Sequence, residues 1–279
     1  MKHVLTIAGS DCSGGAGIQT DLKTFAACGV YGMSVITAIT AQNTLGVTAV
    51  ENVSKELIEK QFRAVFDDIR VDALKIGMLS DVDIIDTVYK MLSIYKPKNI
   101  VLDPVMVSTS GFDLLTTRAK KILVEKLLPI ADLITPNLSE ARAILHEISD
   151  KRIDRISNRD EMVEIGKEIS NYTKGSVLIK GGHLENDACD VLIKKDGEVF
   201  YFNNKRIDTK NTHGTGCTLS SAICSYLAKG YSIEEAVEKG KVFVTNAIKN
   251  SLDIGSGCGP TNPMGELFSK LKKDGVICE

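Results

Sequence analysis

The sequence has no excess of basic residues, no long apolar run and no apolar leader. Its 34 Lys and Arg residues and 36 Asp and Glu residues give a formal net charge of −2. It therefore lacks the positive surplus that a broad nucleic-acid-binding face requires. No apolar run approaches the ~18 residues of a membrane helix, and the apolar start, VLTIAG, is too short for a signal peptide. We expect a soluble cytoplasmic protein without nucleic-acid or membrane partners.

Paired-cysteine motifs are also absent. The chain contains seven cysteines, an odd number, and none of them forms a CxxC pair. This usage argues against a disulfide framework or a zinc site and favours free thiols in a reducing compartment. The four histidines are scattered along the sequence, so we predict none of them to be a metal ligand.

The sequence does contain the alternation of strand-like and helical segments that is typical of an α/β fold. Short β-branched runs alternate with helical patterns such as residues 55–69 and 81–95, which predicts a mostly parallel sheet with helices on both faces. Two alternating runs within 188–208 flank Asp196-Gly197 and predict an antiparallel hairpin at one sheet edge. No linker or repeat interrupts the pattern, so we expect one domain over residues 1–279. The expected strands are 3–9, 32–40, 73–78, 99–105, 131–137 and 176–182.

A glycine-rich segment, residues 9–21 (GSDCSGGAGIQTD), follows the first expected strand. Ligands of open parallel sheets bind beyond the carboxyl ends of the strands, so this segment is a candidate binding loop. Its spacing matches neither the P-loop nor the Rossmann fingerprint. It is therefore either a substrate-side loop of unfamiliar type or a structural turn.

Charged and amide side chains stand at three other strand ends. Asp103 is either a ligand of magnesium or its waters, or a capped or paired carboxylate. Asn137 and Glu140 have capping-box spacing, which is compatible with a second role near a metal-bound phosphate. Lys180 interrupts an apolar run and needs a partner, either a phosphate or a carboxylate. Residues 105–115 are small and polar at their centre and are a candidate mobile cover.

The stretch NTHGTGCTLSSAI, residues 211–223, predicts a loop that turns into a helix near Thr218. Gly214 and Gly216 clear the space in front of the backbone, and the N–H groups of the helix start favour an anion there. The helix dipole is expected to lower the pKa of the Cys217 thiol. The alternative is a small buried cysteine in a tight turn.

These motifs, with GVYGMSVITAITAQNTLGV, DPVMVSTSG, ITPNLSEA and KGGH, occur in the order and spacing of one family. From residue 3 to about residue 264 the chain resembles the hydroxymethylpyrimidine/phosphomethylpyrimidine kinases of thiamine biosynthesis, in the ribokinase-like superfamily. The resemblance implies a three-layer α/β/α sandwich and a homodimer. It also implies that the γ-phosphate of ATP, with magnesium, is transferred to 4-amino-5-hydroxymethyl-2-methylpyrimidine and then to its monophosphate.

The resemblance assigns roles to individual residues. Cys217 stands where most ribokinase-like enzymes have an aspartate base, and would accept the hydroxyl proton late in the transfer. Gln42 would read the pyrimidine edge, since an amide offers both a donor and an acceptor. The remaining matched residues are Gly9, Asp21 and Met78 for the substrate, Asn137, Lys180 and Thr212 for ATP, Asp103 and Glu140 for magnesium, and Gly214, Gly216 and Lys180 beside Cys217 for catalysis.

Three other functions are compatible with parts of the sequence. A pyridoxal or pyridoxine kinase of the same lineage is the main alternative. Relatives that accept pyridoxal carry a second cysteine in the cover loop, whereas residues 107–111 read VSTSG here. A pyrimidine-binding regulator without turnover is disfavoured by the presence of Cys217, Lys180, Asp103 and Glu140 together. A nicotinamide oxidoreductase is disfavoured by the broken Rossmann spacing.

Overall fold

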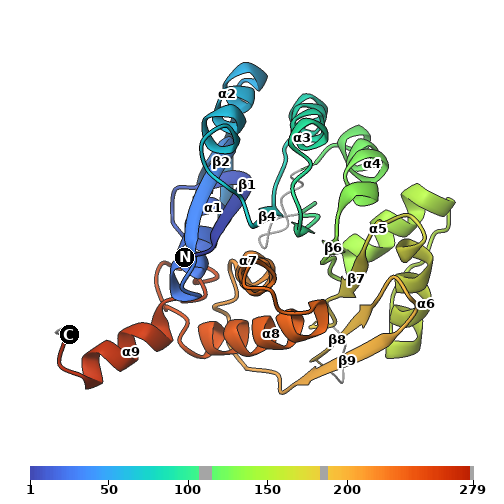
Figure 1. The fold of residues 1–279 in the computed structure, drawn as a ribbon. Coiled ribbons are helices and arrows are strands. Elements are labelled where there is room, and N and C mark those ends of the chain that lie inside the picture. The colour runs from blue at the N-terminus through green and yellow to red at the C-terminus, as the bar shows by residue number, and fades with distance from the viewer. Residues whose placement is uncertain (107–114, 183–187, 277–279) are drawn as a thin grey trace.

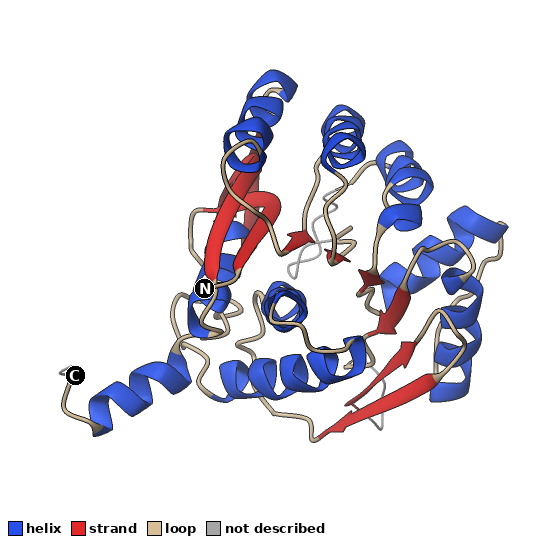
Figure 2. Ribbon diagram, in the orientation of Figure 1, coloured by secondary structure: helices blue, strands red, loops and turns tan. Residues whose placement is uncertain are grey.

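The computed structural model describes residues 1–106, 115–182 and 188–276, which build a nine-stranded sheet with helices on both faces (Figures 1 and 2). The strand order is β3-β2-β1-β4-β5-β6-β7-β8-β9. β2, β1, β4, β5, β6 and β7 run parallel, while β3, β8 and β9 are antiparallel to their neighbours. The strands are β1 (His3–Asp11), β2 (Tyr31–Asn43), β3 (Gly46–Asn52), β4 (Ala73–Ile76), β5 (Ile100–Leu102), β6 (Leu133–Ile134), β7 (Ser176–Ile179), β8 (Ala188–Ile193) and β9 (Val199–Asn204).

The helices cover the sheet as two separate layers, each over its own apolar cluster (Figure 1). α2 to α6 cover one face, and α1, α7 and α8 cover the other. The predicted three-layer α/β/α architecture is confirmed. The helices are α1 (Gly17–Ala27), α2 (Lys55–Phe66), α3 (Val82–Tyr95), α4 (Thr117–Lys126), α5 (Leu138–Ser149), α6 (Arg159–Ser170), α7 (Thr215–Ala228), α8 (Ile233–Lys249) and α9 (Gly265–Lys273), with a 3-10 turn at Leu128–Ile130.

Local sequence accounts for most of these boundaries. Asp81 accepts a hydrogen bond from the backbone of Ile84 and caps α3. All four residues of β4 are buried, which fits a strand covered on both faces. The β8–β9 hairpin is confirmed, and its turn contains Gly197 at φ +92°.

Two features differ from the sequence-based expectation. β3 pairs antiparallel with β2 at the other sheet edge and was not predicted. All of its residues are exposed or half-buried, so it has no clear apolar alternation to reveal it. α7 begins at Thr215 rather than near Thr218, because Gly214, at φ +79°, ends the loop one turn earlier. Within the described ranges, no helix combines the length and apolar character needed to span a membrane.

Candidate active site

The N-terminus of α7 faces the carboxyl ends of the central strands. α7 packs against β1, β4 and β5, so its first turn is held beside the ends of these strands. Its N-cap, Gly214, could not be another residue without a clash, since a Cβ there would lie 2.0 Å from the carbonyl oxygen of Gly15. The backbone N–H groups of Gly216 and Cys217 have no acceptor among the described residues. The helix therefore presents two free donors and its positive end to one spot.

Asp103, Lys180 and Glu140 form a buried charge cluster at this spot. The Lys180 Nζ lies 2.9 Å from the Asp103 Oδ1 and 3.9 Å from the Glu140 Oε2. Asp103 also accepts hydrogen bonds from the hydroxyls of Thr135 and Ser220. Burial opposes ionisation of Asp103, but the charges of Lys180 and the neighbouring Lys75 lower the pKa of its carboxyl. Asp103 is thus an anion whose carboxylate accepts hydrogen bonds from three side chains, Thr135, Lys180 and Ser220.

Glu140 differs from Asp103 in its protonation. The Asn137 side chain accepts from the Glu140 backbone, and the Asn137 backbone donates to the Glu140 Oε2 at 2.7 Å, which confirms the capping box. Burial raises the pKa of the Glu140 carboxyl to about 7, against the charge of Lys180, which lowers it. A positive ligand near Glu140 would favour its ionised form.

Gly216 leaves open space directly in front of this cluster. A Cβ on Gly216 would lie 3.4 Å from the Asp103 Oδ2 and 3.5 Å from the Lys180 Nζ. The donors of α7, the lysine and the two carboxylates therefore all face one small volume. The described residues contain no group of three or more His, Cys, Asp or Glu that could hold a metal ion. Two hard carboxylates instead fit magnesium, which takes its other ligands from phosphates and water.

Cys217 is the third residue of α7, and the prediction for its thiol was wrong. Burial raises the pKa of Cys217 to about 11, and the positive charge of Lys75 and the backbone of Gly17 only partly offset this. The carboxylates of Asp21 and Asp103 raise it further. Desolvation and two nearby anions therefore outweigh the helix dipole, and the thiol is protonated at neutral pH.

Asp21 lies beneath the site and is completely buried. Its carboxylate receives two bonds of 2.9 Å from Lys75 and further bonds from Thr6 and Ser221. Lys75 is also fully buried, which disfavours its charge, but the carboxylates of Asp21 and Asp103 outweigh this desolvation and hold its pKa above the ordinary value. Asp21 therefore supports the floor of the site, and a direct contact with substrate would require this network to open.

Gln42 lies at the end of β2, beside the loop that leads into α7. Its Nε2 is 3.0 Å from the His213 Nε2, and His213 is four residues before Cys217. Gly9 and Met78 are in direct contact, since a Cβ on Gly9 would lie 2.6 Å from the Met78 Cε. Gln42 is thus linked to the loop that leads into α7. Gly9, on β1, contacts Met78, which follows β4.

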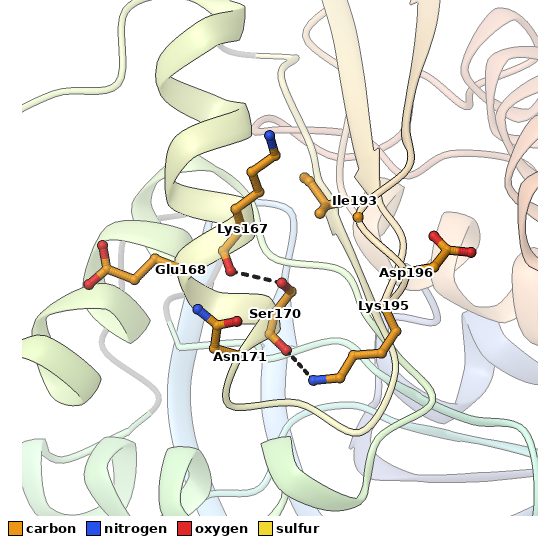
Figure 3. A pocket seen from close by; sticks show the side chains of 8 residues that line it. Lys167, Glu168, Ser170, Asn171, Ile193, Lys195 and Asp196 are labelled. Atoms are coloured by element: carbon orange, nitrogen blue, oxygen red, sulfur yellow. Dashed lines mark hydrogen bonds between the residues drawn. The ribbon is translucent and has the colours of Figure 1, made fainter.

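Thr212 turns the loop into α7 by accepting from both the backbone and the hydroxyl of Thr215. Most of the expected cover, residues 107–114, and His183 lie outside the described residues. A pocket of about 570 Å³ lies elsewhere, between α6 and the β8–β9 turn (Figure 3). Ile193 in the pocket wall pairs with Val177, near the start of β7, whereas Lys180 follows the other end of this strand. The pocket therefore lies at the opposite edge of the sheet from the site. It takes no part in the site.

Comparison with known proteins identifies the family. Residues 11–262 match the family described as phosphomethylpyrimidine kinase. The chain belongs to the phosphomethylpyrimidine kinase family. It is accordingly a phosphotransferase, and the resemblance carried by its motifs is confirmed.

Other members of the phosphomethylpyrimidine kinase family are similar to this protein along almost its whole length. The hydroxymethylpyrimidine/phosphomethylpyrimidine kinase of Staphylococcus aureus (strain MRSA252) is 44% identical over 99% of this chain and 96% of its own. The chain spans only 51% of the chloroplastic thiamine biosynthetic bifunctional enzyme TH1 of Arabidopsis thaliana, at 46% identity.

Two solved structures have the same fold. The phosphomethylpyrimidine kinase of Clostridium difficile 630 has a TM-score of 0.78 and 50% identity, covering 89% of this chain and 100% of its own. A pyridoxal kinase of Bacillus subtilis, solved as an ADP complex, has a TM-score of 0.87 and 40% identity over 96% of this chain and 99% of its own.

Sequence reasoning missed two residues and one side-chain pair that the structure brings to the site. Lys75 interrupts the apolar run ALKIGM in the same way as Lys180 interrupts its own strand, and the same rule would have found it. Ser220 bonds Asp103 from the second turn of α7. Asp11 and His213 are 202 positions apart, and no local pattern could have paired them.

Proposed function

We propose that this protein uses ATP to phosphorylate the hydroxyl group of 4-amino-5-hydroxymethyl-2-methylpyrimidine and then the resulting monophosphate, in thiamine biosynthesis. The observation that carries the proposal is the start of α7, where two free N–H groups and Cys217 face Lys180, Asp103 and Glu140. Phosphoryl transfer depends mainly on positioning and on neutralising charge, and this arrangement supplies both. The family supports the choice of substrate.

The residues divide into three groups in this proposal. Lys180, with Asn137 and Thr212 nearby, holds the phosphates of ATP. Gly214 and Gly216 leave the α7 donors open to the transferred phosphoryl group, whose charge they stabilise as it develops. On the substrate side, Gln42 reads the pyrimidine edge, with Gly9 and Met78 beside it and Asp21 supporting the floor.

Magnesium fits the carboxylate side of the site. Asp103 and Glu140 would hold it directly or through water, and when bound it neutralises phosphate charge. Asp103 already accepts three side-chain bonds, and Glu140 has a pKa of about 7. Glu140 is therefore the carboxyl that loses a proton when the cation and nucleotide arrive.

Cys217 faces the substrate hydroxyl in this proposal. Because its thiol is protonated at neutral pH, it orients the hydroxyl, and it acts as a base only after losing its own proton. The two roles differ in pH dependence: a base gives a kcat that rises with pH toward about 11, whereas an orienting thiol gives a flat profile.

The test is steady-state kinetics of Cys217→Ala with ATP–magnesium and three substrates: the hydroxymethylpyrimidine, its monophosphate and pyridoxal. We expect kcat to fall by roughly 10²-fold or more with both pyrimidines, while ATP and pyrimidine affinities stay near wild type. Near-normal turnover would remove Cys217 from the mechanism. A wild-type protein that prefers pyridoxal would replace the proposed function with pyridoxal kinase activity.

Pyridoxal kinase activity is the second candidate, favoured by the 40% identity to the Bacillus subtilis pyridoxal kinase. The cover segment VSTSG, residues 107–111, contains no cysteine, and this favours the pyrimidine. We further propose that the chain acts as a homodimer and a single domain in the cytoplasm. The family resemblance supports these three points, and sedimentation of the purified protein tests the dimer.

A further inference from the structure

The Asp11 carboxylate fixes which nitrogen of His213 carries a proton. Its Oδ1 accepts from the backbone and hydroxyl of Ser13, and its Oδ2 accepts from the backbones of Gly15 and Ala16. Burial disfavours the charge of Asp11, but the bonds from His213 and Ser13 outweigh burial and lower the pKa of this carboxyl. Asp11 is therefore an anion that can only accept hydrogen bonds.

The His213 Nε2 lies 3.0 Å from the Asp11 Oδ2 and therefore carries a hydrogen. This holds for the neutral Nε2–H tautomer and for the doubly protonated ring alike. The ring packs directly over the Gly15 backbone, since its Cδ2 is only 2.3 Å from where a Cβ on Gly15 would lie. The His213 backbone is also held, by the carbonyl of Gly259 and the N–H of Thr261.

The same Nε2–H of His213 determines the orientation of the Gln42 amide. The Gln42 Nε2 lies 3.0 Å away, but two N–H donors cannot bond each other. The two ends of an amide have the same shape, so a half turn would bring Oε1 to His213, where it shares the one Nε2–H with the Asp11 Oδ2 in a three-centre hydrogen bond. The same half turn suits Thr40. Its one hydroxyl hydrogen has two acceptors, the Ser10 carbonyl at 3.0 Å and the Gln42 Oε1 at 3.4 Å, and after the half turn it donates to Ser10 while the hydroxyl oxygen accepts from the amide nitrogen.

We propose that the Asp11–His213 pair locks the Gln42 amide with its oxygen toward His213 and its nitrogen toward Thr40, which makes His213 a specificity-determining residue. This rests on the proposed function, in which Gln42 reads the pyrimidine edge. Toward a substrate, the locked amide offers one N–H and the second lone pair of Oε1. His213 acts only through Gln42 and is a positioning residue.

A fixed amide distinguishes two pyrimidines of nearly the same shape. A 4-aminopyrimidine presents a ring-nitrogen acceptor beside an amino donor, and both groups match the locked amide. The 4-oxo analogue presents a ring N–H beside a carbonyl oxygen, so it meets a donor with a donor and an acceptor with an acceptor. Unpaired polar groups of this kind give strong discrimination, on the order of 10²-fold or more. The lock thus excludes the deaminated compound.

The test compares kcat/KM for the 4-amino substrate and its 4-oxo analogue in three proteins. We expect wild type to prefer the 4-amino compound by roughly 100-fold or more. In His213→Leu the amide is free to rotate, and this preference falls at least tenfold. In His213→Gln, whose side-chain N–H reaches the same position, the preference stays within about threefold of wild type.

Lys210→Ala, an exposed change in the same loop, is the control and leaves the preference at the wild-type value. A purely structural role for His213 would lower both kcat/KM values by the same factor, and that result overturns the proposal. If wild type fails to phosphorylate the 4-amino compound at all, the proposed function fails instead.

A second measurement tests the lock without any substrate. In protein with ¹⁵N-labelled histidine, the ring nitrogen shifts of His213 are assigned by their loss in His213→Gln. We expect protonated Nε2 in the free protein. A ring protonated only at Nδ1 would leave Nε2 as an acceptor for the Gln42 amide as placed, and would overturn the proposal.

Discussion

Two lysine–aspartate pairs, Lys75–Asp21 and Lys180–Asp103, are each bonded to a serine of α7, and they differ in what surrounds them. In each, the lysine Nζ lies 2.9 Å from its aspartate. Both side chains of Lys75–Asp21 have no exposed surface, whereas Lys180 is 16% exposed beside a 2% exposed Asp103. We call the fully buried Lys75–Asp21 the sealed pair and the partly exposed Lys180–Asp103 the open pair.

The surroundings explain why the second pair is suited to chemistry. Asp21 has its partners supplied by the protein alone, through Lys75, Thr6 and Ser221. Lys180 is shared with a second carboxylate, Glu140, and faces the space that Gly216 leaves open. A sealed pair can only hold the fold, while an open pair with an extra carboxylate has capacity for a charged ligand.

The largest expected effect is that of breaking the sealed pair. Lys75→Met leaves the Asp21 carboxylate buried without its counter-charge, so we expect the free energy of unfolding to fall by roughly 3–5 kcal/mol. Urea unfolding measures this. The double variant Lys75→Met/Asp21→Leu should recover much of the loss, since it removes the stranded charge. A loss below about 1 kcal/mol in the single variant would contradict a structural role for the pair.

Breaking the open pair should affect catalysis more than stability. We expect Lys180→Met to lower kcat by roughly 10²–10³-fold, because a charge that stabilises the transferred phosphoryl group is lost. Its cost in unfolding free energy should be smaller than that of Lys75→Met, since Asp103 keeps its hydroxyl partners and can gain water. Lys151→Met, at an exposed lysine, is the control. Equal stability losses at positions 75 and 180 would remove the distinction.

Glu140, which lies beside the open pair, makes the free energy of unfolding depend on pH in a definite direction. Its folded pKa of about 7 exceeds the ordinary value of 4.5, so the folded chain binds more protons than the unfolded chain between these values. Stability therefore falls as pH rises through this window, by up to roughly 3 kcal/mol. Asp103 acts oppositely: its lowered pKa adds stability above the ordinary value of 3.8, which is lost as pH falls.

Glu140→Gln tests this sign, because glutamine can keep the capping box but does not titrate. Unfolding free energies at pH 5 and pH 8 should show wild type losing stability relative to the variant as pH rises. Parallel pH profiles for the two proteins would show that Glu140 titrates normally.

The smallest expected effect on stability is that of Gly216→Ala, which fills the space in front of Asp103 and Lys180. The Cβ of Gly216→Ala meets only ordinary contacts, so unfolding free energy should change by less than about 1 kcal/mol while kcat falls. Gly214→Ala is the matched contrast: its Cβ would collide with the Gly15 carbonyl, so it should lower the free energy of unfolding more than Gly216→Ala does. Full activity in Gly216→Ala would show that the space is not used.

Apolar patterns predicted the fold well where a strand or helix has a clear buried face. They failed for β3, whose exposed side chains do not alternate, and for the start of α7, which a backbone clash at Gly214 decides. Site residues were predictable as types at strand ends, as with Lys180. Their environments were not, since the high pKa of the Cys217 thiol depends on burial and on carboxylates distant in sequence.

The hydrogen bonds around α7 also bear on the order of folding. Asp11 is 202 positions from His213, Asp21 is 200 from Ser221, and Asp103 is 117 from Ser220. Closing loops of this length costs entropy that local contacts do not repay, so such contacts form late. During synthesis, the first half of the sheet leaves the ribosome well before α7 does. We therefore expect the candidate site to assemble late in folding, when α7 docks onto strands that are already in place.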